Sequence, residues 1–439
     1  MANNRLLEKA KQILLMNHRE GFTLPSTNIY PFQWKWDSGF VALGFIHFNL
    51  DMAMSEMRTL FKAQWSNGFV PHIIFHDSPD EKKYFPNAAF YSANLSPESS
   101  KTYQTTTLTQ PPIEGWVLER IFKKAGNLPE GRKFVKEMFP KIMAQHEYLY
   151  NNRDPFDEGL VYIQHNWESG TDNSPVWDEI WNSFDAPEYN FSRKDTQHVQ
   201  DAQRPRQREY DYYLYLIDSF KKYNYRDSDI AEHSHFLVQD PLFNSMLIAS
   251  NNSLIRLAES AGYPEKVKQL RDWNRKSIQS FNDKLFDEKN GLYRHYNLRE
   301  NKWLSGLTSS GFAPLFAGIP SLDRAAKMLS VMDRFSKDGQ YFLCPSFDPD
   351  DIRFESQRYW RGPVWVNMNW LIYHGLKEYG FTDMAQKIRE NTLQMVREQG
   401  FYEYFEPDKE KSKLLQKGYG GTDFSWTAAL IIDLLKENK

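Results

Sequence analysis

Apolar residues recur at helical spacing along most of this 439-residue chain, with polar residues on the opposite faces. The spacing predicts helices over residues 4–18, 38–63, 113–125, 130–150, 209–222, 308–317, 321–334, 362–379, 382–398 and 424–437. The clearest helical hairpin covers residues 241–285, because Asp240 can cap its first helix and Gly262 can end it. The stretch 362–379 is apolar on nearly all sides, so it should lie inside the protein.

A short aromatic motif follows three of these helices, at residues 156–162, 286–293 and 400–403, and each copy predicts a turn into a short strand. Repeated helix pairs must bury their faces against neighbouring pairs. We therefore expect an all-α fold, a closed (α/α)6 toroid in which long loops and short β-hairpins gather at one mouth. Residues 1–439 are interpreted as a single domain, with lid-like loops at about 71–112 and 182–208.

Composition narrows the function classes. The formal net charge of -3 gives no reason to expect nucleic acid or a membrane as a partner, and a homo-oligomer stays open. The single cysteine, Cys344, excludes an internal disulfide, and no apolar run approaches the roughly 18 residues of a membrane span. Because the N-terminus shows no secretion signal, we expect a cytoplasmic protein. An aromatic content of 15% suits either a bulky core or a carbohydrate cleft.

The segment 33–40 carries two tryptophans around a lysine, followed at once by Asp37 and Ser38. Sugar rings pack on aromatic planes and their hydroxyls bind charged acceptors, so this pattern indicates a sugar site. The alternative is a partly buried helix start with Asp37 or Ser38 as its N-cap. Residues 357–365 combine two indoles, a phenol and two guanidinium groups, which is more typical of a binding platform than of a core.

Two further segments offer carboxylates for acid–base chemistry. Residues 166–175 hold Glu168 and Asp172, either of which could be a general acid whose pKa is raised by aromatic walls. Asp172 could instead simply cap the helix expected near Pro175. Within residues 400–407, Glu403 shares its strand face with phenylalanines, and a carboxylate there is costly unless it has a function.

Other chemistry finds little support. The chain has no His-Glu-x-x-His motif and no paired cysteines, so we expect no metal and no cofactor. The stretch 232–235 contains two histidines, but a solvated loop explains it better.

The motifs at residues 34–39, 167–173, 359–365, 401–403 and 424–428 resemble, in order and along most of the chain, those of glycoside hydrolase family 63. In its compactness the chain is similar to the bacterial mannosylglycerate and glucosylglycerate hydrolases of that family. The resemblance implies an (α/α)6 catalytic domain that hydrolyses α-glycosides with inversion, Asp172 being the general acid and Glu403 the general base. Inversion needs the two carboxyls roughly 6.5–9.5 Å apart, to admit a water.

The resemblance and the aromatic platforms together imply a set of sugar-binding residues: Tyr30, Trp34, Trp36, Asp37, Gln110, Trp167, Glu168, Tyr359, Trp360 and Trp365. The substrate would be a small sugar compound. A glycerate leaving group would need an arginine for its carboxylate, and we expect Arg206 with Tyr212 to supply that site. The alternative for this arginine-rich stretch is a solvated basic segment. The sequence does not separate glucose from mannose.

Three other functions stay open at this stage. The first is an oligosaccharide α-glucosidase of the same family. The second is an (α/α)6 sugar epimerase or isomerase, for which His72 and His76 would be the candidate histidines. The third is a sugar-binding protein without catalysis, against which the presence of both Asp172 and Glu403 argues.

Overall fold

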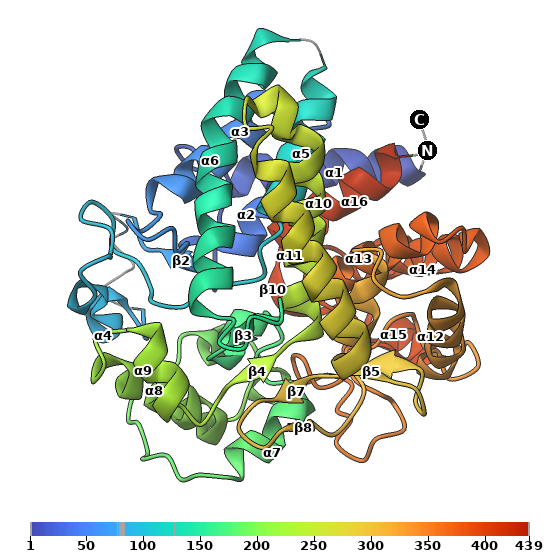
Figure 1. Ribbon diagram of the computed structural model, residues 1–439. Coiled ribbons are helices and arrows are strands. Elements are labelled where there is room, and N and C mark those ends of the chain that lie inside the picture. Colours follow the sequence, from blue (N-terminus) through green and yellow to red (C-terminus); the bar gives the residue numbers. More distant parts are fainter. Residues whose placement is uncertain (1, 77, 79–83, 127, 438–439) are drawn as a thin grey trace.

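The computed structural model describes residues 2–76, 78, 84–126 and 128–437 (Figure 1). Its longer helices are α1 (Ala2–Asn17), α2 (Lys35–Phe45), α3 (Leu50–Lys62), α5 (Glu114–Ala125), α6 (Pro129–Asn152), α8 (Gln207–Lys221), α10 (Pro241–Ala261), α11 (Lys266–Ser280), α12 (Leu322–Phe335), α13 (Val366–Glu378), α14 (Thr382–Gln399) and α16 (Ser425–Lys436). Shorter ones are α4 (Ala88–Tyr91), α7 (Asp178–Trp181), α9 (Asp227–His233), α15 (Lys409–Leu415) and the 3-10 helix η8 (Ser309–Leu315).

Six of these segments form a closed inner ring. Going round it, α2 contacts α5, α5 contacts α10, α10 contacts η8, η8 contacts α13, α13 contacts α16, and α16 returns to α2. All residues of α2 and η8 are buried, and α13 and α16 are buried over most of their length. A helix that is apolar all round requires protein on every side, and the ring supplies it.

The outer layer consists of α1, α3, α6, α11, α12 and α14. These helices are amphipathic, so one face packs on the ring and the other meets solvent. Each outer helix precedes an inner one in the chain, which gives six helix pairs among the described residues. Figure 1 shows α1 beside α16, where the first and last pairs meet and close the toroid. The expected (α/α)6 arrangement is therefore confirmed.

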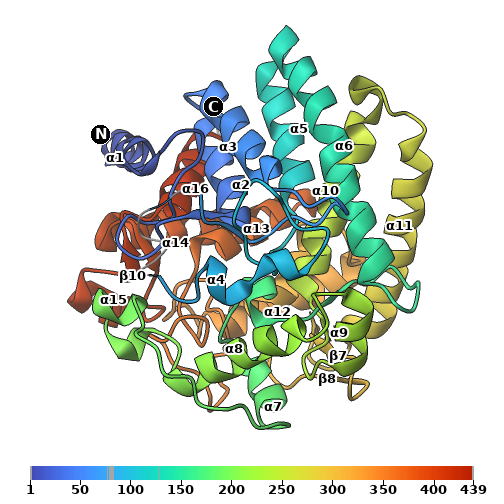
Figure 2. The ribbon, with the colours of Figure 1, turned by 90° about the vertical axis from the view of Figure 1, so that its left-hand side faces the viewer.

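Long connections lead from the outer helices to the N-terminal ends of the inner ones, so they gather at one mouth of the ring. Short antiparallel strands stiffen them: β1 (Gln33–Trp34) with β2 (Ile73–Ile74), β9 (Tyr402–Tyr404) with β10 (Tyr419–Thr422), β5 (Phe286–Asp287) with β6 (Leu292–Tyr293), and a sheet of β3 (Tyr162–Ile163), β4 (Val238–Gln239), β7 (Tyr296–Asn297) and β8 (Lys302–Trp303). Figure 2 shows α4 in front of this mouth. The three aromatic motifs lead into β3, β6 and β9, as expected.

Some predicted helix boundaries were wrong. The stretch 38–63 forms two helices, because Asn49 accepts a hydrogen bond from the backbone N–H of Met52 and starts α3. The stretch 308–317 forms a 3-10 helix. In the described part of the chain, no helix is long and apolar enough to span a membrane.

Candidate active site

A cavity opens at the mouth of the ring, with an empty volume of about 930 Å³ that includes open solvent at its entrance. Its walls come from the connections between outer and inner helices. The chemically functional side chains among the lining residues are Tyr30, Trp34, Trp36, Asp37, His72, Tyr84, Tyr91, Gln110, Trp167, Asp172, Arg193, Lys194, Asp195, Arg204, Tyr210, Tyr359, Trp360, Glu403 and Trp426. Aromatic planes, carboxylates and guanidinium groups therefore meet in one space.

The Trp-Lys-Trp-Asp segment forms one wall. Trp34 is held in β1 by pairing with Ile73, and the following residues begin α2. Trp36 packs over Gly170, where a Cβ would approach its ring to 2.5 Å, so only glycine fits there. Burial, and then the charge of Glu403, raise the pKa of Asp37 well above its usual range.

Asp172 lies opposite, on the loop after the Trp167 turn. Burial raises its pKa to about 7, against the charge of Arg204, which lowers it. The helical turn at Pro175 is preceded by Ser174, so Asp172 is not its N-cap. A carboxyl with this pKa can hold a proton at neutral pH and still release it, as a general acid must.

Glu403 lies in β9 and points into the cavity. Its Oε1 accepts a hydrogen bond of 2.8 Å from the Tyr30 hydroxyl, and its Oε2 accepts one of 2.9 Å from the N–H of Gly421. Burial raises its pKa, whereas Arg204, with Nη1 3.4 Å from Oε2, favours the ionised form. Glu403 is thus a carboxylate held by several donors, suited to accept a proton from water.

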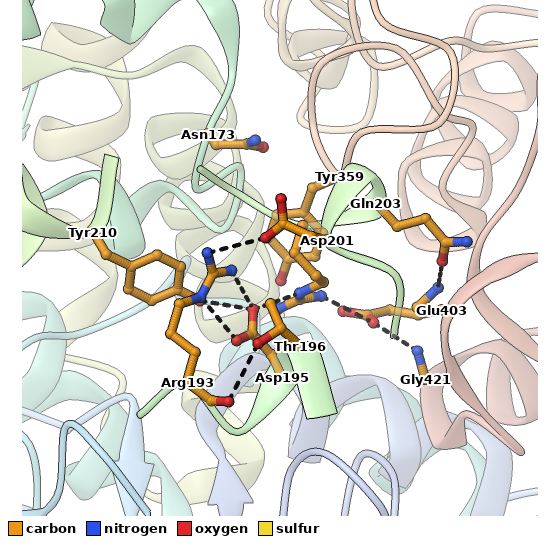
Figure 3. A network of polar contacts seen from close by, with 12 residues as sticks. Asn173, Arg193, Asp195, Thr196, Asp201, Gln203, Tyr210, Tyr359, Glu403 and Gly421 are labelled. Atoms are coloured by element: carbon orange, nitrogen blue, oxygen red, sulfur yellow. Dashed lines mark hydrogen bonds and ion pairs between the residues drawn. The ribbon is translucent and has the colours of Figure 1, made fainter. Parts of the chain in front are cut away.

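Arg204 connects Glu403 to a second acidic residue, Asp195. Its Nε donates to Asp195 at 2.9 Å, its Nη2 donates to the Tyr30 hydroxyl at 2.9 Å, and its guanidinium stacks 4.1 Å from the ring centre of Tyr359. Asp195 also accepts two hydrogen bonds from Arg193, and this network of charges runs across the cavity wall (Figure 3).

Most of the residues expected from the sequence line this cavity together. Those that do are Tyr30, Trp34, Trp36, Asp37, Gln110, Trp167, Asp172, Tyr359, Trp360 and Glu403. Four others lie outside it, namely Glu168, Trp365, Arg206 and Tyr212.

Glu168 is fully buried behind the wall. Its carboxylate accepts from the backbone N–H of Thr109 and Gln164 and forms an ion pair with Arg153, Nη1 to Oε2 being 3.1 Å. It therefore anchors the loops that carry the site instead of reaching the cavity. Trp365 stacks flat behind Trp360, with ring centres 3.8 Å apart.

Arg206 and Tyr212 point away from the cavity. Arg206 occupies the N-cap position of α8, where its backbone N–H donates to Glu209. Its half-exposed side chain forms an ion pair of 2.8 Å with Glu355, and Tyr212 stacks on Trp181. Arg204 and Tyr210, each two residues earlier, line the cavity instead. The stretch in which we expected the glycerate site therefore contributes Arg204 and Tyr210 to the cavity, not Arg206 and Tyr212. Tyr210 and Tyr212 both lie on α8, where residues two apart face different sides of the helix, and an ion pair directs the side chain of Arg206 toward Glu355.

Several lining residues escaped the sequence analysis, among them Tyr84, Tyr91, Arg193, Lys194, Asp195 and Trp426. Tyr91 ends the short helix α4, and Trp426 lies in the first turn of α16 within the motif at residues 424–428. The others come from irregular loops without periodicity. The only signal for the others was the length of their loops.

His72 also lines the cavity, but its Nδ1 is hydrogen-bonded to Thr106 and burial lowers its pKa to about 3. The ring of His76, the second candidate histidine, is hydrogen-bonded to the side chain of Gln33. Among the described residues, no group of three or more histidine, cysteine, aspartate or glutamate side chains is arranged to hold a metal ion.

The proteins that this chain resembles are glycoside hydrolases, in agreement with the geometry of the site. A family model described as the mannosylglycerate hydrolase MGH1-like glycoside hydrolase domain covers residues 30–427. The chain belongs to this family. It is therefore a glycoside hydrolase, and no finding supports an epimerase.

Named relatives of the hydrolase extend over nearly its whole length. A mannosylglycerate hydrolase of Rubrobacter radiotolerans is 39% identical over 98% of this chain and 97% of its own. A glucosylglycerate hydrolase of Mycolicibacterium hassiacum is 32% identical over 98% of each chain. The crystal structure of a family 63 mannosylglycerate hydrolase from Thermus thermophilus, in complex with Tris and D-glycerate, matches with a TM-score of 0.90 at 35% identity, covering 98% of this chain and 99% of that one.

Proposed function

We propose that the enzyme hydrolyses the α-glycosidic bond between mannose or glucose and glycerate, with inversion at the sugar carbon. The observation that carries this proposal is the meeting of two unlike carboxyls, Asp172 and Glu403, with Arg204 in one aromatic-lined cavity. The names of the relatives, one for each sugar, support the substrate class and leave both sugars as candidates.

In this mechanism Asp172 is the general acid. It donates its proton to the glycosidic oxygen while Glu403 removes a proton from a water on the opposite face of the sugar ring. Asp37 binds sugar hydroxyls, and its negative charge helps to stabilise the positive charge that develops on the ring. The indoles of Trp34 and Trp36 pack against the sugar.

The glycerate carboxylate would bind on the Arg204 side of the cavity. Arg204 is nearly completely buried and lines the cavity, and its N–H groups already bind Asp195, Glu403 and Tyr30. It is therefore a fixed positive charge at the wall where the glycerate carboxylate would bind. Tyr210 lines the same wall, and its hydroxyl donates to Asp195 at 3.2 Å. A charge-assisted bond there would distinguish glycerate from a neutral leaving group.

We also propose that the catalytic domain spans the whole chain and acts in the cytoplasm on a small sugar compound. The free thiol of Cys344, fully buried, is in keeping with a reducing compartment. Fractionation of source cells, with activity followed in each fraction, tests the location.

The substrate proposal is tested by comparing matched glycosides of glycerate and of glycerol. We expect kcat/KM to be about 10- to 150-fold higher for the glycerate compound, since a hydrogen bond to a charged group is worth about 1.5–3 kcal/mol. The variant Arg204→Met should reduce this ratio toward one, even though it slows both substrates. Arg206→Met, two residues away and facing Glu355, is the matched control and should keep the ratio. Equal rates on both glycosides with the wild-type enzyme would favour an oligosaccharide α-glucosidase.

A further inference from the structure

Glu403 has little direct access to bulk water. Its Oε1 is covered by the Tyr30 hydroxyl, its Oε2 by the Gly421 N–H and Arg204, and the residue is 1% exposed. On the protein side the carboxylate is thus enclosed by donors, and its remaining side faces the cavity.

After one inverting reaction, each catalytic carboxyl has the opposite protonation state from the one in which it started. The general acid has lost its proton and the general base has gained one, so one proton must return before the next turnover.

Two phenols connect the two carboxyls. The Tyr30 hydroxyl, 2.8 Å from Glu403, lies 3.4 Å from the Tyr359 hydroxyl. The Tyr359 hydroxyl in turn interacts with the Asp172 carboxylate and favours its charged form. Tyr359 is fixed by the guanidinium stacked on its ring and by a hydrogen bond from its N–H to the carbonyl of Gln203. Two hydroxyl contacts therefore lead from Glu403 through Tyr30 to Tyr359, which lines the same cavity as Asp172.

We infer that Tyr30 and Tyr359 form a proton relay that returns the proton from Glu403 to Asp172 after each turnover. The inference rests on the acid and base roles proposed above. Glu403 gives its proton to the Tyr30 oxygen, Tyr30 gives its own to Tyr359, and Tyr359 gives its own to Asp172. Three O–H bonds break and three form, and both tyrosines end as neutral phenols.

The electrostatics of the site favour this direction. Burial raises the pKa of both carboxyls, that of Asp172 to about 7, but three hydrogen-bond donors oppose the rise at Glu403 by stabilising its charged form. Burial also raises the pKa of both tyrosines well above the usual value, so each stays protonated and can donate and accept at once.

The test is the kinetics of Tyr30→Phe and Tyr359→Phe. Return of the proton occurs in the free enzyme after product release, so it affects kcat and not kcat/KM. We expect kcat to fall by at least ~10-fold in each variant, more than kcat/KM falls, since a positioned proton transfer contributes ~10²–10⁴. Small buffers such as imidazole or formate should restore kcat with rising concentration, at constant pH and ionic strength.

Tyr404→Phe is the matched control, because its hydroxyl lies on the neighbouring residue and donates to the carbonyl of Gln203, outside the relay. Its kcat should not respond to buffer concentration. An unchanged kcat in both relay variants, or equal falls in kcat and kcat/KM without buffer response, would overturn the relay. Asp172→Asn and Glu403→Gln are measured alongside, and substantial activity in them would contradict the catalytic assignment itself.

Discussion

At the scale of single residues, Gly420 fixes the position of Glu403, the proposed general base. It adopts a φ of +72°, and a Cβ built there would lie 2.3 Å from Oε2 of Glu403. The next residue donates the N–H that binds the same oxygen. Any side chain at position 420 must therefore displace the carboxylate that the reaction needs.

We predict that Gly420→Ala lowers kcat by about 10² or more, because a misplaced catalytic group costs about that factor. The matched control is Gly380→Ala, which has a similar φ of +76° but no neighbouring atom within 4 Å of the added Cβ. Both variants should lose about 1–2 kcal/mol of stability to backbone strain, and only Gly420→Ala should lose activity. Similar activities for the two would show that the glycine turn does not position Glu403.

The Arg204–Arg206 pair shows how far a sequence can predict such a site. The aromatic motifs with Asp172 and Glu403 have a specific pattern, and ten of the fourteen expected side chains line the cavity. The choice between two arginines depends on where α8 begins, at Gln207, and on the ion pair that draws Arg206 toward Glu355. Local periodicity encodes neither the exact start of a helix nor a tertiary ion pair of this kind.

At the scale of elements, close contacts between inner helices determine which of them are neighbours in the ring. A Cβ on Gly44 of α2 would lie 2.6 Å from Cα of Ala429 in α16, and one on Gly375 of α13 would lie 2.6 Å from the backbone of Leu315 in η8. Helical periodicity predicted these elements, but not which pairs would touch. Small residues at the contacts carry that information.

We predict that Gly44→Ala destabilises the enzyme by about 1–3 kcal/mol, because the added methyl group overpacks the α2–α16 contact. Denaturant unfolding measures the effect. The double variant Gly44→Ala/Ala429→Gly keeps the Cα that the added methyl group meets, so it should recover little of the loss. A stable Gly44→Ala variant would show that the two helices can separate without cost.

At the scale of the whole molecule, Asp433 forms hydrogen bonds to several inner helices of the ring. It is fully buried in α16, and its carboxylate binds His47 at 2.7 Å, Trp370 at 2.8 Å and Arg120 at 3.3 Å. These partners follow α2 or lie in α13 and α5, so one carboxylate connects four members of the ring. Despite its burial, hydrogen bonds from its histidine partners hold its pKa well below the usual range.

We predict that Asp433→Asn costs about 3–5 kcal/mol of stability at neutral pH, the range for breaking a buried ion pair. Because the folded pKa lies below the unfolded value of about 3.9, this contribution is complete above that pH and is lost as the pH falls below it. The difference in Tm from wild type should therefore narrow only below about pH 4. Asp272→Asn, which removes an exposed ion pair with Arg275, is the control and should change little.

The most direct measurement for the whole account is the anomer of the sugar first released. Proton NMR of the reaction with an α-glycoside of glycerate, followed before mutarotation, distinguishes the two outcomes. Asp172 and Glu403 acting as an inverting acid–base pair predict the β-anomer, with at least ~10²-fold loss of kcat in Asp172→Asn and Glu403→Gln. Initial release of the α-anomer would contradict the account, because it would require Glu403 to attack the sugar instead of activating a water.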